Sequence, residues 1–135
     1  MKLVLDSNIF ISAFYWGGNP QEVINRIIEG LDELYVSNEI LAEISEVMMR
    51  PKFKTDMQTI DTYIKAIEKA GKKVFITGKV KEICRDKDDN TILECGLLSG
   101  AEYIITGDDD LLSLKRYQNI KIISVHEYLK INRLH

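Results

Sequence analysis

Residues 103–112 read Tyr103-Ile104-Ile105-Thr106-Gly107-Asp108-Asp109-Asp110-Leu111-Leu112. A short run of β-branched and aromatic residues ends at a glycine, and three acidic residues open the next apolar segment. This order predicts a buried strand over 103–106, a turn, and a short helix over 108–114. The apolar run 2–5, followed by Asp6, repeats the arrangement near the start of the chain. Both segments therefore predict a strand that delivers a carboxylate at its carboxyl end.

The rest of the chain continues this alternation of strands and helices. Further strands are expected over 33–36, 73–77 and 121–124, and helices over 8–15, 20–29, 38–50, 56–70, 90–98 and 126–131. Strands that alternate with helices indicate right-handed βαβ units and a parallel sheet covered on both faces. The predicted fold class is therefore α/β: a single three-layer α/β/α domain spanning 1–135, with a central parallel β-sheet.

The amino-acid composition limits the class of protein and the side chains available for catalysis. A chain of 135 residues, 45% hydrophobic and 29% charged, fits one globular domain. No apolar run approaches the roughly 18 residues of a membrane span, and Asp6 comes too early for a signal-peptide core. Cys84 and Cys95 lack metal or redox spacing, so reduced thiols and a cytoplasmic location are expected. With only two histidines, catalysis has to rely on carboxylates.

Charge is distributed unevenly along the sequence. Residues 50–87 hold eleven Lys or Arg against five acids, a local charge of +6, whereas the remainder carries −9. The formal net charge of −3 therefore hides a basic middle and acidic ends. Basic residues that flank the acidic motifs are candidates for phosphate contacts: Arg50, Lys52, Lys54, Arg85 and Lys87.

Acidic residues follow the predicted strands at several points. In a parallel sheet the loops after the strands meet at one edge, where ligands collect. Each acid alone could be an ordinary helix cap. Together they would repel one another unless a cation neutralises them, and Mg²⁺ or Mn²⁺ prefers carboxylate oxygens. The candidates are Asp6, Glu43, Asp89, Asp108 and Asp110.

Four segments resemble the motifs of PIN-domain ribonucleases, in particular the small toxin components of bacterial and archaeal toxin–antitoxin pairs (VapC-like). The segments are 3–9 with Asp6, 40–44 with Glu43, 86–93 with Asp89, and 103–112 with Asp108 and Asp110. The resemblance spans essentially the whole chain, although Lys87 stands where relatives commonly have proline.

This resemblance implies a metal-dependent endoribonuclease that hydrolyses single-stranded RNA, with one or two Mg²⁺ or Mn²⁺ ions. Asp6, Glu43, Asp89 and Asp108 would be catalytic ligands, and Asp110 a further ligand or a residue that holds a metal-bound water. Ser7, Asn8 and Thr106 would orient a phosphate or water, although capping is an ordinary role for them. A cognate antitoxin and a homodimer or higher homo-oligomer are the expected protein partners.

Other interpretations remain open. A PIN-fold protein could bind RNA with weak or no cleavage. A haloacid-dehalogenase-like phosphatase also has an Asp after its first strand, but it needs a second Asp where Asn8 stands. A receiver domain would need a lysine after its last strand, where residues 124–126 read Ser-Val-His. Tyr15, Trp16 and Phe53 could stack on bases, although such aromatics more often belong to a core or an interface.

Overall fold

The computed structural model describes residues 1–133. Its elements are, in chain order, β1 (Lys2–Leu5), α1 (Ser7–Trp16), α2 (Gly18–Ile28), β2 (Glu33–Ser37), α3 (Asn38–Met48), the 3₁₀ turn η1 (Pro51–Phe53), α4 (Met57–Ala70), β3 (Lys72–Val74), α5 (Lys87–Ser99), β4 (Tyr103–Ile105), α6 (Asp109–Leu114), β5 (Arg116–Tyr117), β6 (Ile120–Ile123) and α7 (Val125–Arg133). Strands and helices alternate as expected for an α/β fold.

The strands form one sheet in the order β3-β2-β1-β4-β6-β5. All pairs are parallel except β5–β6, which is antiparallel. The predicted central parallel sheet is therefore confirmed, and the structure adds one antiparallel edge strand, β5, that the sequence did not predict. The added strand β5 is only two residues long and pairs through a tight hairpin in which Gln118 has a φ of 54°.

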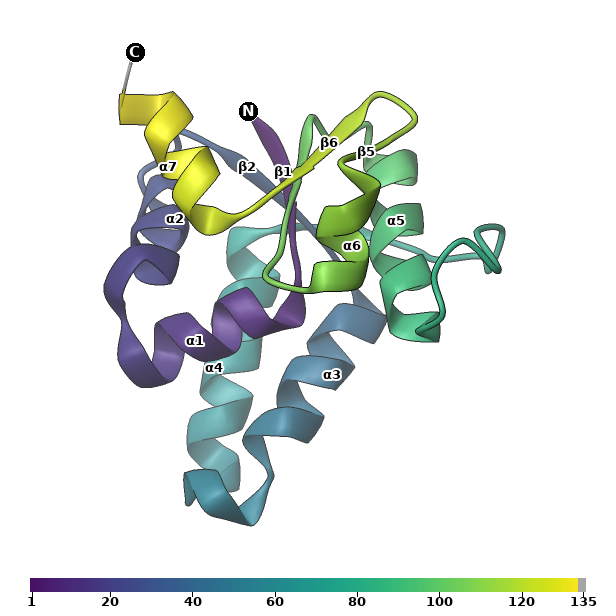
Figure 1. Ribbon diagram of the computed structural model, residues 1–135. Coiled ribbons are helices and arrows are strands. Elements are labelled where there is room, and N and C mark those ends of the chain that lie inside the picture. The colour runs from purple at the N-terminus through teal and green to yellow at the C-terminus, as the bar shows by residue number, and fades with distance from the viewer. Residues whose placement is uncertain (134–135) are drawn as a thin grey trace.

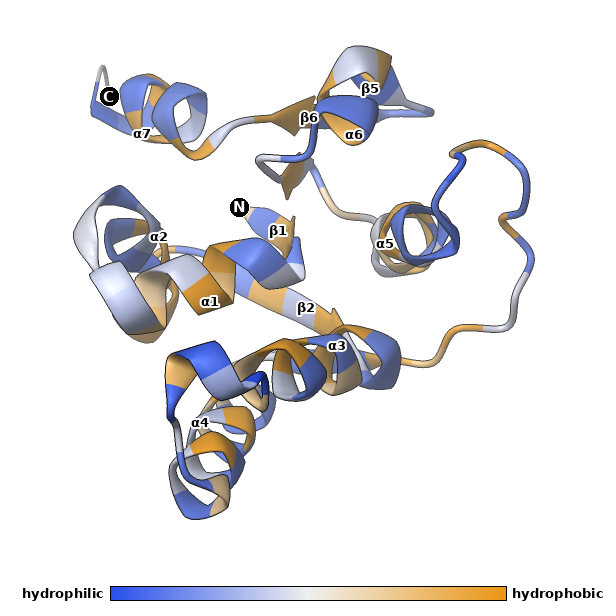
Figure 2. Ribbon diagram, turned by 60° about the horizontal axis from the view of Figure 1, so that its bottom comes forward, coloured by the Kyte–Doolittle hydropathy of each residue, from blue (hydrophilic) through white to orange (hydrophobic). Residues whose placement is uncertain are grey.

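Helices cover the sheet from both sides, giving three layers (Figure 1). Helix α5 packs against β1, β2, β3 and β4, and α1 and α2 lie across the strands from it (Figure 2). Gly96 lets α5 approach the sheet closely, because a Cβ there would lie 3.0 Å from the Ile104 side chain. The central strands β1 and β4 are almost wholly buried, as a two-sided core requires.

Most predicted elements agree with the structure to within a few residues, and the largest difference concerns β3. This strand ends at Val74 instead of Thr77. Thr77 instead donates its backbone N–H and hydroxyl to Glu94 of α5, so residues 75–86 leave the sheet as a long connection. The helix predicted over 90–98 begins earlier, at Lys87, with Asp86 as its N-cap.

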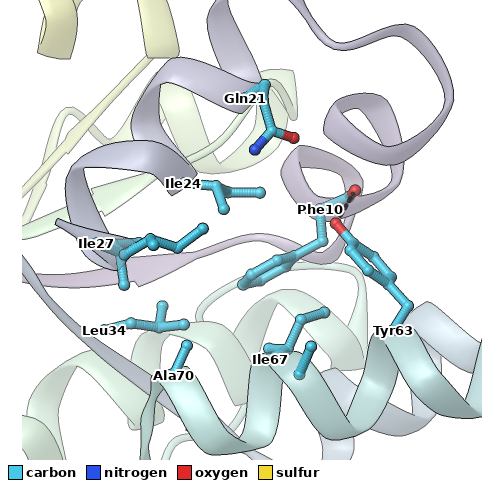
Figure 3. A pocket seen from close by; sticks show the side chains of 10 residues that line it. Phe10, Gln21, Ile24, Ile27, Leu34, Tyr63, Ile67 and Ala70 are labelled. Atoms are coloured by element: carbon cyan, nitrogen blue, oxygen red, sulfur yellow. Dashed lines mark hydrogen bonds between the residues drawn. The ribbon is translucent and has the colours of Figure 1, made fainter.

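An apolar pocket of about 240 Å³ lies between α2 and α4 (Figure 3). Phe10, Ile24, Ile67 and Tyr63 are among the residues that line it, and the Tyr63 hydroxyl donates to the Phe10 carbonyl at 2.7 Å. None of the candidate acids lines this pocket. Within residues 1–133, every helix is too short or too polar to cross a membrane.

Candidate metal centre

The pairing of β1 with β4 brings the first and last acidic motifs together. Leu5 lies opposite Ile105, and the Asp6 N–H donates to the Ile105 carbonyl at 3.0 Å. The next residues are therefore neighbours: the Thr106 hydroxyl donates to Asp6 Oδ2 at 2.7 Å and accepts the Asp108 N–H at 3.0 Å. Asp6 and Thr106 are both buried. One hydroxyl thus positions two candidate acids separated by a hundred residues.

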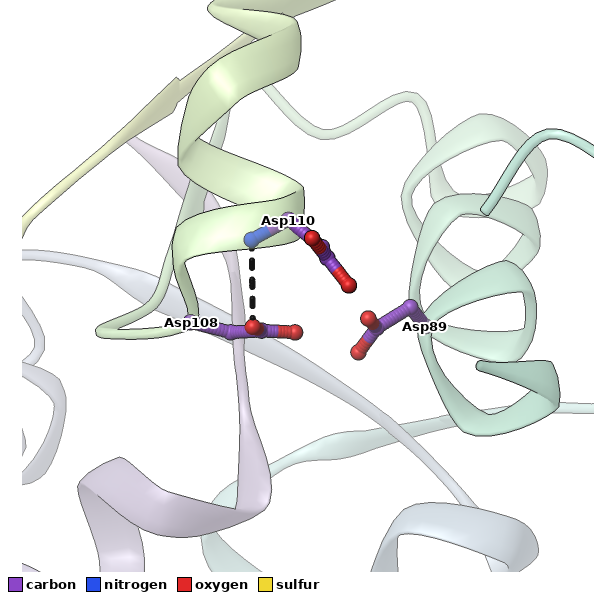
Figure 4. Close-up of side chains that lie close together, drawn as sticks. All are labelled: Asp89, Asp108 and Asp110. Carbon is purple, nitrogen blue, oxygen red and sulfur yellow. Dashed lines mark hydrogen bonds between the residues drawn. The ribbon is translucent and has the colours of Figure 1, made fainter. Parts of the chain in front are cut away.

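Asp108 also belongs to a cluster of three carboxylates between α5 and α6. Oxygen atoms of Asp89, Asp108 and Asp110 lie within 4.8 Å of one another, and Figure 4 shows their side chains directed toward a common space between the two helices. Asp108 also accepts the Asp110 N–H at 3.2 Å. Asp89 Oδ2 is buried and has no hydrogen-bond partner among the described residues. A buried carboxylate oxygen without a donor is costly unless something cationic meets it.

The acids of this region hold their protons more strongly than isolated carboxyls. Burial, the Asp108 side chain and the Asp108 charge raise the pKa of Asp89 well above its usual range. Burial also raises the pKa of Asp6, and the Asp108 charge adds to this. Burial and the charges of Asp88 and Asp6 raise the pKa of Glu43 to about 7. The fold therefore concentrates negative charge that a divalent cation would relieve.

Helix capping explains only some of these acids. Asp86 caps α5 and Asp108 caps α6 through their own carboxylates. Asp6 occupies the N-cap of α1, but its side chain makes no capping bond, and Asp89 lies inside the first turn of α5. Asp6 and Asp89 are also the most buried of the candidate acids. Their burial therefore needs another explanation than local helix chemistry.

The donor set fits a hard divalent cation. It consists of carboxylate oxygens, the ligands that Mg²⁺ and Mn²⁺ prefer, and it includes the unpartnered Asp89 Oδ2. Asp89, Asp108 and Asp110 are close enough to share one ion. Asp6 joins them through Thr106, whereas half-buried Glu43 lies outside the three-residue cluster and interacts with Asp6 and Asp88.

The other predicted residues divide into two groups. Near the acids, the buried Ser7 hydroxyl donates to Asp6 at 3.3 Å and exposed Arg85 donates to both oxygens of Asp110, at 2.9 and 3.1 Å. Asn8 and Lys87 are exposed, in the first turns of α1 and α5. The second group lies in and beside η1, at the end of α3 opposite the sheet (Figure 1), and consists of Arg50, Lys52 and Lys54.

Two residues that position the site were missed from the sequence. Glu94 is almost fully buried and accepts from Thr77, Gly78 and Val80, and Asn90 bonds both backbone groups of Cys84. Together they tie the connection that carries Arg85 to α5. A signal was available for Glu94, because it is the only charged residue between Thr91 and Gly100.

Comparison with known proteins agrees with this arrangement. The chain is 33% identical over 138 residues to the uncharacterized protein MJ1680 of Methanocaldococcus jannaschii, across the whole of this chain and 83% of that protein. A chain in the crystal structure of VapBC2 from Rickettsia felis, bound to a DNA fragment from their promoter, has the same fold: the TM-score is 0.66 at 14% identity, covering 92% of this chain and 98% of that one. Residues 2–110 match the profile of the PIN domain. The chain therefore belongs to the PIN domain family.

Proposed function

We propose that this protein is a Mg²⁺- or Mn²⁺-dependent endoribonuclease that hydrolyses phosphodiester bonds of single-stranded RNA. The observation that carries the proposal is the buried, unpartnered Asp89 Oδ2 inside a cluster of three carboxylates. Membership of the PIN family removes the reason to consider a haloacid-dehalogenase-like phosphatase or a receiver domain.

Asp89, Asp108 and Asp110 would hold one ion, and Asp6 with Glu43 would complete the site or hold a second. A bound divalent cation supplies an activated water and stabilises charge on the attacking and leaving oxygens. The chain's own residues set the geometry. Thr106 fixes Asp6 relative to Asp108, and Ser7 donates a second hydrogen bond to Asp6.

Substrate phosphates would be met by cations and amides at the rim of the site. Arg85 is exposed and held beside the acids by Asp110, so it can pass from that carboxylate to a phosphate. Lys87 and Asn8 are exposed at the starts of the two helices that carry Asp89 and Asp6. We assign these three residues to substrate binding.

The deciding experiment is cleavage of a generic single-stranded RNA with Mn²⁺. We expect activity that excess chelator removes and Mn²⁺ restores, and that Asp6→Asn, Asp89→Asn and Asp108→Asn each abolish. Asp109→Asn is the matched control, because exposed Asp109 lies between two candidate ligands and outside the cluster. A folded Asp89→Asn variant with full metal-dependent activity would refute the proposal.

The alternative, RNA binding without cleavage, predicts a different result. Such a protein would retain RNA on a filter in the presence of chelator and leave it intact after Mn²⁺ is added. The acid cluster argues against it, because five acids with raised pKa values or mutual contacts destabilise a fold that gains nothing from them.

A toxin role with a cognate antitoxin is the biological setting we propose. Its support is the structural neighbour, a chain of VapBC2 from Rickettsia felis bound to a DNA fragment from their promoter. Co-expression with the product of an adjacent small gene should relieve any growth arrest and yield a stable complex. The homodimer stays a prediction, which sedimentation of the purified chain would test.

A further inference from the structure

Three aromatic side chains form a patch where the end of α1 meets η1. Tyr15 stacks on Phe53 with ring centroids 4.3 Å apart and an interplanar angle of 11°, and the Tyr15 hydroxyl hydrogen bonds Thr55 at 2.5 Å. Trp16 is in contact with both rings. We call Tyr15, Trp16 and Phe53 the aromatic patch. Its base is rigid, because a stacked pair and a hydrogen bond join α1 to the segment that connects α3 and α4.

Trp16 presents its indole to solvent on this rigid base. Its side chain is 71% exposed, although a tryptophan gains more than most residues from burial. The Tyr15 and Phe53 rings meet it at 62° and 72°, so neither stacks face to face on the indole. The geometry leaves aromatic surface available for a planar partner.

Cations without acidic neighbours flank Phe53 along the chain. Residues 49–55 contain Arg50, Lys52 and Lys54 and no acid. All three cations are exposed, and within residues 1–133 none lies within 4.0 Å of a carboxylate. Lys52 Nζ lies 5.0 Å from the centroid of the Phe53 ring. The nearest following acid, Asp56, is engaged at the N-terminus of α4, where it accepts the Thr59 N–H at 2.7 Å.

Helix α1 links this patch to the candidate metal centre. Asp6 is its N-cap and Trp16 its last residue, so the two lie about 15 Å apart along a ten-residue helix. That separation corresponds to a few nucleotides of an extended single strand. Exposed aromatics beside unpaired cations are the combination by which proteins bind unpaired bases and the phosphates between them.

We propose that the aromatic patch binds the bases of single-stranded RNA a few nucleotides from the bond that is cut, with Trp16 stacking on a base and Lys52 and Lys54 contacting phosphates. This inference rests on the proposed function, since it names how the substrate is held. An acidic protein partner would satisfy the lysines alone, and a two-fold contact between copies would bring the same three cations of each copy toward one another. The open indole face beside these cations favours unpaired bases as the occupant.

The protein supplies its own reporter, because Trp16 is its only tryptophan. Titration of the wild-type chain with oligoadenylate in excess chelator, which prevents cleavage, should quench Trp16 fluorescence saturably. An abasic strand of equal length should bind more weakly and leave the fluorescence nearly unchanged, because it offers phosphates without bases. Absence of quenching by oligoadenylate would overturn the proposal without any substitution that could disturb folding.

Substitutions then separate the contribution of base stacking to RNA binding from the contribution of the lysine charges. Trp16→Leu should weaken oligoadenylate binding about tenfold while binding the abasic strand as the wild type does. The matched control is Phe75→Leu, since Phe75 is equally exposed at 71% but lies outside the patch. Log affinity falls as log salt concentration rises. The double change Lys52→Ala and Lys54→Ala should make this slope shallower by about 0.7 for each lysine.

Cleavage assays distinguish failure of this inference from failure of the proposed function. Trp16→Leu should raise KM and leave kcat unchanged, because the patch lies away from the acids. An active enzyme whose KM does not respond to Trp16→Leu refutes the patch and leaves the nuclease standing. Saturable quenching by RNA in a protein that cleaves nothing refutes the nuclease and leaves the patch standing. Emission that changes with protein concentration alone would assign the patch to self-association and overturn the inference.

Discussion

The Thr106 hydroxyl is the single group on which the geometry of the acids depends most. It donates to Asp6 and accepts from the Asp108 backbone, so it joins β1 to the start of α6 at a buried position. A β-branched residue suits the end of a strand, and threonine adds a hydroxyl that valine would lack. Thr106 therefore acts through the acids that it positions.

Replacing Thr106 with valine should weaken both folding and metal binding. The substitution keeps the shape of the side chain but leaves buried Asp6 Oδ2 without its donor, at a cost of about 1–3 kcal/mol. Chemical denaturation should report this loss, and Mn²⁺ titration calorimetry should report a weaker site. Thr106→Ser keeps the hydroxyl and should restore much of both. Equal behaviour of the valine and serine variants would contradict the role given to the hydroxyl.

Asp89→Asn should separate stability from function. Above pH 8, where Asp89 ionises because its pKa is raised to about 8, the metal-free variant should be more stable than the wild type by about 1 kcal/mol, since the amide carries no charge and can donate to Asp108. The stabilisation that Mn²⁺ gives the wild-type protein should disappear. Thermal unfolding with and without Mn²⁺ measures both effects, and Asp109→Asn should change neither by much. If the metal-free Asp89→Asn protein were less stable than the wild type at this pH, the carboxylates of the cluster would not repel one another as we infer.

At the scale of elements, the connection between β3 and α5 is held by one buried carboxylate. Glu94 Oε2 accepts from Thr77 N and Oγ1 and from Gly78 N, and Oε1 accepts from Val80 N. Burial alone would raise the pKa of Glu94, but the N–H groups of Val80, Thr77 and Gly78 outweigh it and lower the pKa. The carboxylate therefore stabilises the fold above its unfolded pKa of 4.5, and this contribution is lost as the pH falls below that value.

Glu94→Gln should loosen this connection without unfolding the protein. A glutamine has one acceptor oxygen, and its amide group would face an N–H donor, so we expect a loss of about 2 kcal/mol. Hydrogen exchange should accelerate over residues 77–85, and RNA cleavage should fall because Arg85 loses its anchorage. Glu46→Gln on the exposed side of α3 is the control and should change neither. Unaltered exchange at residues 77–80 would show that the carboxylate is dispensable.

Sequence reasoning succeeded where local pattern determines structure. Apolar runs and caps predict the strands and helices, and the shared edge at which parallel strands end predicts that the acids after β1 and β4 lie near one another. It failed where tertiary contacts determine the local structure. Arg116 and Tyr117 have no strand pattern and pair only because β6 lies beside them. Arg50 is close to Glu43 in sequence, but α3 carries it away from the sheet, which no local pattern reveals.

At the scale of the whole molecule, charge is separated in space as it is in sequence. The acids gather between the starts of α1, α5 and α6, whereas the unpaired cations of residues 50–54 lie beyond the far end of α3 (Figure 1). Under the proposed function, an RNA strand that crosses from one to the other would meet positive charge first and the candidate metal centre second. Such a division directs a polyanion toward an acidic site that would otherwise repel it.

The metal-free protein should lose stability as the pH rises from about 4 to about 7. The pKa values of Asp6, Asp89 and Glu43 are raised above the ordinary values of 3.8 for Asp and 4.5 for Glu, in the case of Glu43 to about 7. Between the ordinary and raised values the unfolded chain has released protons that the folded chain keeps, so the free energy of unfolding falls with increasing pH.

A divalent cation should reverse this trend, because it competes with the same protons and binds more tightly as the carboxyls ionise. Urea denaturation from pH 4.5 to 8, in chelator and in Mn²⁺, should therefore give curves that diverge toward high pH. Asp89→Asn should flatten the chelator curve and bring the Mn²⁺ curve down to it. A metal-free wild-type protein more stable at pH 8 than at pH 5 would mean that other groups of the folded protein already compensate the negative charge of these acids. The electrostatic argument for a metal centre would then fail.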